Sequence, residues 1–231
     1  MIGHVREDLA AVRERDPAAR GLLETAFTYP GLHALWAYRL AHHLWTTDRR
    51  TAARALSWAA RVLTSVDIHP AAVIGRRVFI DHALGVVIGE TAVVGDDVTI
   101  YQGVTLGGTS LEHGKRHPTV GSRVVVGAGA KVLGPITIGD DSRIGANAVV
   151  VHSVPPNSVV VGIPGKIISR SLPSDPLIEG EGELAPDPVG VSLESLFERL
   201  HELEEQVGVR SHSHEVRPSS TGIWSGDDFS I

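Results

Sequence analysis

Three short stretches of the chain place a histidine close to a charged residue, and they are the strongest candidates for chemistry. They are Asp67-Ile68-His69, Asp81-His82 and Arg116-His117. A carboxylate that binds one nitrogen of an imidazole fixes its tautomer, and the other nitrogen can then remove a proton from a hydroxyl group. A single aspartate at a turn more often satisfies nearby backbone groups. Two Asp-His pairs together with an Arg-His pair favour general-base catalysis.

Asp67 and His82 lie fifteen residues apart, so the fold must return the chain to the same place at about that interval for them to meet. The surrounding sequence has such a repeat, because aliphatic residues recur there at a spacing of six. The ladder positions are Ile68, Ile74, Ile80, Ile88, Val94, Ile100, Leu106, Val120, Val126, Val132, Ile138, Ile144 and Val150. Glycine often follows a ladder residue directly, and a small or aliphatic residue stands four positions after most of them.

A period of six is the repeat of a parallel β-helix, in which each hexapeptide forms one flat side and one corner. Three sides make a coil of about eighteen residues, and stacked coils bury the ladder as a continuous core. The turns of a β-sandwich come about every 8–12 residues and drift in spacing, unlike this ladder. The sequence therefore predicts a mainly β fold with α, in which a parallel β-helix spans residues 66–170. Stacking would bring Asp67 and His82 to one edge.

The ladder slips twice, by two residues after Ile80 and by eight after Leu106. The first slip follows Asp81-His82. The second inserts the polar loop GGTSLEHGKRHPT, which carries Arg116-His117. A β-helix core gains nothing from such a loop, and loops held by a rigid scaffold often carry function. We therefore expect this loop to form part of the site.

The composition of the 231-residue chain excludes several classes of protein. A net charge of −6 and a pI near 6.0 argue against nucleic acid or an anionic membrane as the main partner. The absence of cysteine excludes disulfides, thiolate zinc sites and a cysteine nucleophile. The first residues are charged, unlike a signal peptide, and no apolar stretch is long enough to span a membrane. We expect a cytoplasmic protein.

Helical patterns precede the repeat, and residues 1–65 predict an N-terminal helical domain. A charged helix is expected to end at Pro17, and a second to begin after Pro30-Gly31. The apolar face of a third is predicted to hold Ala52, Ala55, Ala59, Val62 and Leu63. Trp36, Trp45 and Trp58 are interpreted as core or subunit-contact residues.

Three further segments are expected after the repeat. Residues 171–190 are rich in Pro, Gly and acidic residues, which predicts a flexible linker. Residues 191–208 carry leucines at helical spacing, which predicts a short amphipathic helix. Residues 209–231 are polar and rich in Gly and Ser, which predicts a mobile tail.

Several strings within residues 8–170 together resemble the serine O-acetyltransferase family, whose members belong to the hexapeptide-repeat acyltransferases. The strings are VRERDPA, GLHALWAYRLAHHLW, VDIHPAAVIG, DHALGVVIGETAVVGDDV, VTLGGT, KRHPTVG, VGAGAKVLG and VPPNSVVVGIPGKI. Their combination is more specific than the repeat alone, which many acyltransferases share. The resemblance implies a left-handed β-helix and transfer of acetyl from acetyl-CoA to the hydroxyl of L-serine, the first step of cysteine synthesis from serine.

The resemblance also implies roles for individual residues. Asp67 and His82 match the catalytic dyad, in which His82 removes the hydroxyl proton while serine attacks the thioester directly. The residues that match the serine-binding set are Asp16, Asp81, Arg116 and His117. The positions that match the coenzyme A groove are the backbone near Gly108, Ala128 and Ala146, with Lys166 as a phosphate contact. No metal and no permanently bound cofactor is implied.

Implied partners follow from the same resemblance. The family forms homotrimers with active sites between neighbouring β-helices, and the short helical region leaves hexamer formation open. Cysteine presents the same ammonium and carboxylate as serine, so feedback inhibition is expected. The sequence ends in GDDFSI, which resembles the ending through which the family binds O-acetylserine sulfhydrylase, so Ile231 is expected to bind that partner.

Three other functions stay open at this point. A sugar or antibiotic acetyltransferase would share the fold but would not need Asp16 and the Arg-His pair to recognise an amino acid. A γ-type carbonic anhydrase would use His69, His82 and His117 as zinc ligands between subunits, which metal analysis of the pure protein tests. A non-catalytic scaffold predicts no turnover with acetyl-CoA.

Overall fold

The computed structural model of the protein describes residues 2–170 and Arg199. The predicted linker, amphipathic helix and C-terminal tail, with Ile231, lie outside the described residues except for Arg199. In the described part, no helix is long and apolar enough to cross a membrane.

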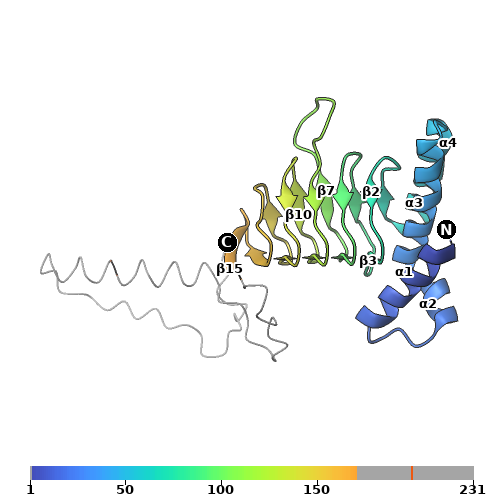
Figure 1. Cartoon of the computed structure of the whole chain (residues 1–231), viewed down its shortest axis with the longest axis horizontal. Helices are drawn as coiled ribbons and strands as arrows, with labels where there is room; N and C mark the ends of the chain where they lie inside the picture. The colour runs from blue at the N-terminus through green and yellow to red at the C-terminus, as the bar shows by residue number, and fades with distance from the viewer. Residues whose placement is uncertain (1, 171–198, 200–231) are drawn as a thin grey trace, which may run out of the picture. The chain divides into compact units, whose positions relative to one another are not determined.

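Short strands wind into stacked triangular coils (Figure 1). The first sheet contains β1 (Asp67–Ile68), β4 (Val87–Ile88), β7 (Thr105–Gly107), β10 (Lys131–Leu133) and β13 (Val149–Val150). The second contains β2 (Val73–Ile74), β5 (Val93–Val94), β8 (Thr119–Val120) and β11 (Thr137–Ile138). The third contains β3 (Phe79–Ile80), β6 (Thr99–Ile100), β9 (Val125–Val126), β12 (Arg143–Ile144), β14 (Ser158–Val161) and β15 (Lys166–Arg170). All pairs are parallel except β14–β15, an antiparallel pair at the end of the coils.

The turns between the sheets stack into three corners. The third-to-first corner contains residues 81–86, 101–104, 127–130 and 145–148. The first-to-second corner contains residues 69–72, 89–92, 108–118 and 134–136. The second-to-third corner contains residues 75–78, 95–98, 121–124 and 139–142. Backbone hydrogen bonds join each turn to the one above, as between Gly103 N–H and Leu84 O at 2.8 Å.

All thirteen ladder residues are buried, and the most exposed of them, Ile74, is 9% exposed. Burying each aliphatic side chain is worth about 1.5–3 kcal/mol, so the ladder is the main source of stability of the coils. The predicted parallel β-helix is therefore confirmed. The two slips of the ladder occur at the positions predicted from the sequence, in the turn of residues 81–86 and in the loop of residues 108–118.

Four helices precede the coils: α1 (Ile2–Arg15), α2 (Leu22–Thr28), α3 (Pro30–Thr46) and α4 (Arg50–Thr64). The short α2 was not expected from the sequence, because its seven residues are too few to show a helical period. Tyr38 of α3 joins the helices to the first coil. Its hydroxyl donates to Ala72 O at 2.6 Å and accepts from Ile74 N at 3.2 Å. This satisfies backbone groups on the edge strand β2, which would otherwise remain unpaired.

The residues predicted to share the apolar face of α4 are largely exposed in this structure. Val62 is 63% exposed and Leu63 is 83% exposed, and neighbouring Trp58 is 68% exposed. The buried residues of α4 are Ala53, Ser57 and Thr64. Since α4 packs against α3, small side chains face the partner helix and allow a close approach, while the larger apolar ones lie on the opposite side.

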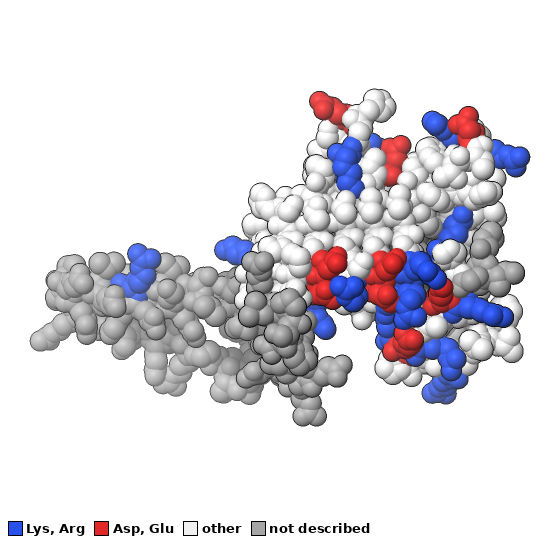
Figure 2. All heavy atoms as spheres, in the orientation of Figure 1, with Lys and Arg blue, Asp and Glu red and all other residues white. Residues whose placement is uncertain are grey.

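Charged side chains of opposite sign follow one another along the second-to-third corner, visible as a row of blue and red in Figure 2. Asp97 pairs with Arg77 at 2.7 Å and with Arg15 of α1 at 2.6 Å. Further along, Arg123 pairs with Asp141 at 2.6 Å. These side chains neutralise one another, so the row stabilises the stacking register and offers little net charge to a ligand.

Candidate active site

The first slip forms a tight turn that carries His82. Both His82 and Ala83 have positive φ angles, 56° and 63°. Left-handed backbone is uncommon outside glycine and is found disproportionately at functional sites. The turn leaves 72% of the His82 side chain exposed, with Nε2 3.8 Å from Oδ2 of Asp81. The ring therefore projects from the third-to-first corner beside a carboxylate.

The carboxylate of Asp16 lies close to this turn. The hydroxyl of Tyr29 donates to Asp16 Oδ2 at 2.6 Å, and the backbone N–H of Ala18 donates to Oδ1 at 2.8 Å. These hydrogen bonds, and more weakly the charge of His82, lower the pKa of the Asp16 carboxyl. Burial and the bond to Asp16 raise the pKa of Tyr29 to about 12, so Tyr29 stays a donor. We call Asp16, Tyr29, Asp81 and His82 the His82 half-site.

The backbone of Asp67 lies beside the same turn, but its carboxylate contacts Arg61 and not His82. The backbone N–H of Asp67 donates to Val86 O at 2.9 Å, which puts the two segments side by side as the repeat predicts. Oδ2 of Asp67 accepts a hydrogen bond from Arg61 at 3.2 Å, while Nε2 of His82 lies 3.8 Å from Oδ2 of Asp81. The expected contact between the side chains of Asp67 and His82 is therefore not formed in this structure.

The loop of residues 108–118 projects well beyond the neighbouring turns (Figure 1) and returns Arg116 and His117 to the first-to-second corner. Nη2 of Arg116 donates to Oε2 of Glu90 in the coil below, and this bond lowers the pKa of the Glu90 carboxyl. His117 is 8% exposed and is held by hydrogen bonds with Thr91. We call Glu90, Thr91, Arg116 and His117 the Arg116 half-site.

His69 lies on the first-to-second corner, one coil below Glu90. Its Nδ1 accepts the backbone N–H of Ala71 at 3.0 Å, and its ring meets Trp45 edge-on at 5.1 Å. Burial lowers the pKa of His69, so the ring is neutral near pH 7. Within residues 2–170, no group of three His, Asp or Glu side chains is arranged to hold a metal ion.

The two half-sites occupy different corners of the coil. Between His82 and Glu90 the chain runs from one corner through β4 to the next corner. One side of a hexapeptide coil is about five residue spacings long, which is roughly 15 Å at the rise of a β-strand. A free amino acid is only about as long as one residue of the chain, roughly 4 Å. One serine molecule therefore cannot touch the His82 half-site and the Arg116 half-site of the same chain.

The predicted coenzyme A positions divide between the same two corners. Ala128 and Ala146 stack on the third-to-first corner, where the N–H of Asn147 donates to Ala128 O at 2.8 Å. Gly108 starts the loop, and a methyl group on it would lie 3.3 Å from Nε2 of His117. Lys166 begins β15 at the end of the coils.

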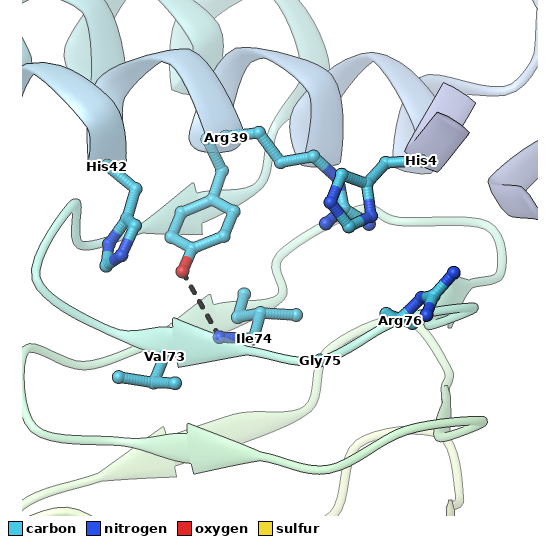
Figure 3. Close-up of a pocket in the computed structure, with 8 residues that line it drawn as sticks. His4, Arg39, His42, Val73, Ile74, Gly75 and Arg76 are labelled. Carbon is cyan, nitrogen blue, oxygen red and sulfur yellow. Dashed lines mark hydrogen bonds between the residues drawn. The ribbon is translucent and has the colours of Figure 1, made fainter. Parts of the chain in front are cut away.

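A pocket of about 340 Å³ lies elsewhere, between the helices and β2 (Figure 3). The hydrogen bond drawn at Ile74 in Figure 3 is the one that its backbone N–H donates to the hydroxyl of Tyr38, and Arg39 and Arg76 also line the pocket. Arg39 pairs with buried Asp8 at 2.8 Å, and Arg76 pairs with Glu7. Because carboxylates of α1 already neutralise both arginines, the pocket belongs to the joint between helices and coil.

Comparison with known proteins now identifies the family. The model of the bacterial transferase hexapeptide (six repeats) matches residues 117–152. The curated serine acetyltransferase of Mycobacterium tuberculosis is 61% identical over 231 residues, which are 100% of this chain and 100% of that one. The chain belongs to the serine acetyltransferase family. Membership confirms the resemblance drawn from the sequence, including the left-handed β-helix preceded by helices, and makes the protein an acyltransferase.

Two solved structures of the family are similar in fold. The Brucella abortus serine acetyltransferase in complex with coenzyme A is 45% identical, with a TM-score of 0.72, and the match covers 74% of this chain and 68% of that one. A serine acetyltransferase in complex with cysteine is 46% identical, with a TM-score of 0.72 over 73% of this chain and 70% of that one.

Sequence reasoning missed Tyr29, Glu90 and Thr91, which hold the predicted site residues in place. The contacts of Glu90 and Thr91 could have been predicted from the spacing of the repeat. Val94 of β5 lies opposite Val120 of β8, a separation of 26 residues. The same separation puts Glu90 opposite Arg116 and Thr91 opposite His117. Tyr29 had no such signal, because its contact with Asp16 depends on how the helices pack.

Proposed function

We propose that this enzyme transfers the acetyl group of acetyl-CoA to the hydroxyl of L-serine by direct attack, with His82 as the general base. The serine oxygen forms a bond to the thioester carbonyl carbon while His82 takes the hydroxyl proton. Collapse of the tetrahedral intermediate breaks the carbon–sulfur bond, and the proton on His82 passes to the departing coenzyme A thiolate. The products are O-acetylserine and coenzyme A. The exposed, projecting ring of His82 supports this role, because a base must reach its substrate.

Asp67 is proposed to orient His82 once the site is filled. This requires Asp67 to leave Arg61. Both side chains of that pair are exposed, 61% for Arg61 and 41% for Asp67, and an exposed ion pair is worth only about 0.2–1 kcal/mol. Substrate binding can therefore free the carboxylate at small cost.

Serine is proposed to bind between two subunits. In the His82 half-site, Asp16 and Asp81 supply negative charge for the ammonium group. In the Arg116 half-site of the neighbouring subunit, Arg116 and His117 supply donors for the carboxylate. The observation that carries this proposal is the position of the two half-sites on different corners of one coil.

An exposed apolar surface beside His82 supports a subunit contact there. Leu84, two residues after His82, is 67% exposed, and Val87 on the first sheet is 37% exposed. Large apolar side chains beside a polar site are usual where protein surfaces meet. A homotrimer around the β-helices would cover them, and it would place the corner of one coil against the next coil.

Coenzyme A is proposed to bind along the same subunit boundary. Ala128 and Ala146 would line it from the corner of His82, and Gly108 from the loop of the neighbour, with Lys166 near the phosphates. The small side chains at these positions allow a ligand to approach the backbone closely. Cysteine is proposed to compete with serine, because it presents the same ammonium and carboxylate.

We also propose that residues 227–231, with Ile231, bind O-acetylserine sulfhydrylase. An Ile side chain buried in the partner would contribute about 1.5–3 kcal/mol, which is roughly ten- to a hundredfold in affinity. A synthetic peptide DDFSI should compete with O-acetylserine for the sulfhydrylase. A lack of competition would contradict the proposal.

One assay tests the main proposal. Thiol release from acetyl-CoA is followed with L-serine and, in parallel, with sugar and other hydroxyl acceptors; L-serine should be strongly preferred. His82→Ala should lower kcat by about 10²- to 10⁴-fold, the usual contribution of a general base. Near-normal turnover of a folded His82→Ala protein would contradict the assignment.

A further inference from the structure

Thr91 holds the Arg116 half-site through all of its polar groups. Its hydroxyl oxygen accepts the backbone N–H of Arg116 at 3.0 Å and that of His117 at 3.1 Å. Its carbonyl oxygen accepts from Nζ of Lys115 at 2.7 Å. Its backbone N–H points to Nδ1 of His117 at 3.2 Å. Residues 115–117 are therefore bound to one residue of the coil below.

The hydroxyl of Thr91 also reaches Nδ1 of His117, at 2.9 Å. A hydroxyl group has two lone pairs and one proton. Both lone pairs accept backbone N–H groups here, so the proton is left for Nδ1. A backbone N–H can only donate, and it also points at Nδ1. Nδ1 must therefore be an acceptor, and in the neutral ring the proton sits on Nε2.

Protonation of His117 would add a proton to Nδ1, where it would face the two groups of Thr91 that donate to this nitrogen. Burial, and next the charge of Arg116, lower the pKa of His117, with a smaller contribution from Lys115, while Glu90 opposes them. The ring is thus neutral at pH 7 and offers Nε2–H as a donor. Its position is set closely as well, because a methyl group on Gly89 would lie 2.1 Å from that nitrogen.

We propose that Thr91 is a positioning residue for substrate recognition: it fixes His117 as a neutral Nε2–H donor aimed at the carboxylate of the acceptor amino acid. The inference rests on the proposed function, since it assigns a ligand to Nε2–H. It also explains why a histidine, not a second arginine, stands beside Arg116. A neutral donor adds a directed hydrogen bond in a buried place where a second cation would be costly.

Thr91→Val keeps the shape of the side chain and removes the hydroxyl. Two partly buried backbone N–H groups and Nδ1 each lose one partner, so we expect KM for L-serine to rise about 10- to 100-fold. KM for acetyl-CoA should change less than about twofold, the ordinary scatter of a surface substitution. Thr91→Ser should restore the serine KM, because it returns the hydroxyl. Thr137→Val, at the exposed position of strand β11, is the matched control and should leave both constants unchanged.

Equal increases in both KM values, or a failure of Thr91→Ser to restore the serine KM, would overturn the proposal, because Thr91 would then only order the loop. An independent measurement needs no substitution at Thr91. Nitrogen NMR of the full-length enzyme labelled in its histidines, with His117 assigned by the loss of its signals in His117→Gln, reports the tautomer. Neutral His117 with its proton on Nε2 is expected, and a proton on Nδ1 would refute the proposal. If wild-type enzyme failed to acetylate serine, the proposed function would fall while the tautomer result would stand.

Discussion

Replacing Gly89 with alanine should disable serine binding through a single methyl group. That group would lie 2.0 Å from Cδ2 and 2.1 Å from Nε2 of His117, whereas ordinary contacts are 3.4–4 Å. The ring must therefore move by about 1.4 Å, and a displacement of about 1 Å in an active site can cost roughly 100-fold in rate. We expect kcat/KM for L-serine to fall at least about 100-fold in Gly89→Ala.

The control for this prediction is an equally crowded glycine away from the site. A methyl group on Gly121 would lie 2.2 Å from Oδ1 of Asp140, on the second-to-third corner. Either substitution should destabilise the fold by about 1–3 kcal/mol, the usual effect of overpacking. Only Gly89→Ala should lose activity when both are assayed below their unfolding temperatures. Full activity of a folded Gly89→Ala protein would refute the reasoning, because His117 would then be free to move.

Other predictions concern stability. Leu106→Ala should lower the free energy of unfolding by about 2–5 kcal/mol, because Leu106 is fully buried in the ladder. Urea titrations measure this loss, and a loss below about 1 kcal/mol would contradict a continuous core. Asp8→Ala should cost about 3–5 kcal/mol, because it leaves the mostly buried side chain of Arg39 without its partner. Asp8→Asn should cost less, and the reverse order would contradict the ion pair. His69 and His117 have folded pKa values below the usual 6.5, so the unfolded chain binds more protons and stability should fall as pH drops from about 6.5 through the folded values. His69→Gln should flatten that slope in denaturant titrations at several pH values, and an unchanged slope would contradict the assignment of His69.

The core of the β-helix could be predicted from the sequence because its repeat depends on local spacing alone. Each ladder residue is buried by the coils directly above and below it, so a period of six determines which side chains point inward. The α4 helix shows the limit of such patterns. Trp58, Val62 and Leu63 share an apolar face, but the pattern cannot tell whether that face packs within the chain or remains for another surface. In this structure small residues pack against α3 and the large ones are exposed.

The site could be predicted in part. His82 and Arg116 were found as candidates from residue type and from the slips of the ladder. Their separation onto two corners follows from the same ladder once each residue is assigned to a side. The contact between Asp16 and Tyr29 could not be predicted, because it depends on how the helices pack. The partner of Asp67 could not be predicted either, since Arg61 reaches it from α4.

The central claim, that each active site combines the His82 half-site of one subunit with the Arg116 half-site of its neighbour, is tested most directly by subunit complementation. His82→Ala and Arg116→Ala chains, each nearly inactive alone, are co-expressed with different tags and the mixed oligomers are purified. Every purified mixed trimer contains the two chains in a 2:1 or 1:2 ratio, so about one of its three subunit boundaries joins an intact His82 to an intact Arg116. We expect serine acetylation at about one third of the wild-type rate. Activity no higher than that of the two variants alone would contradict it.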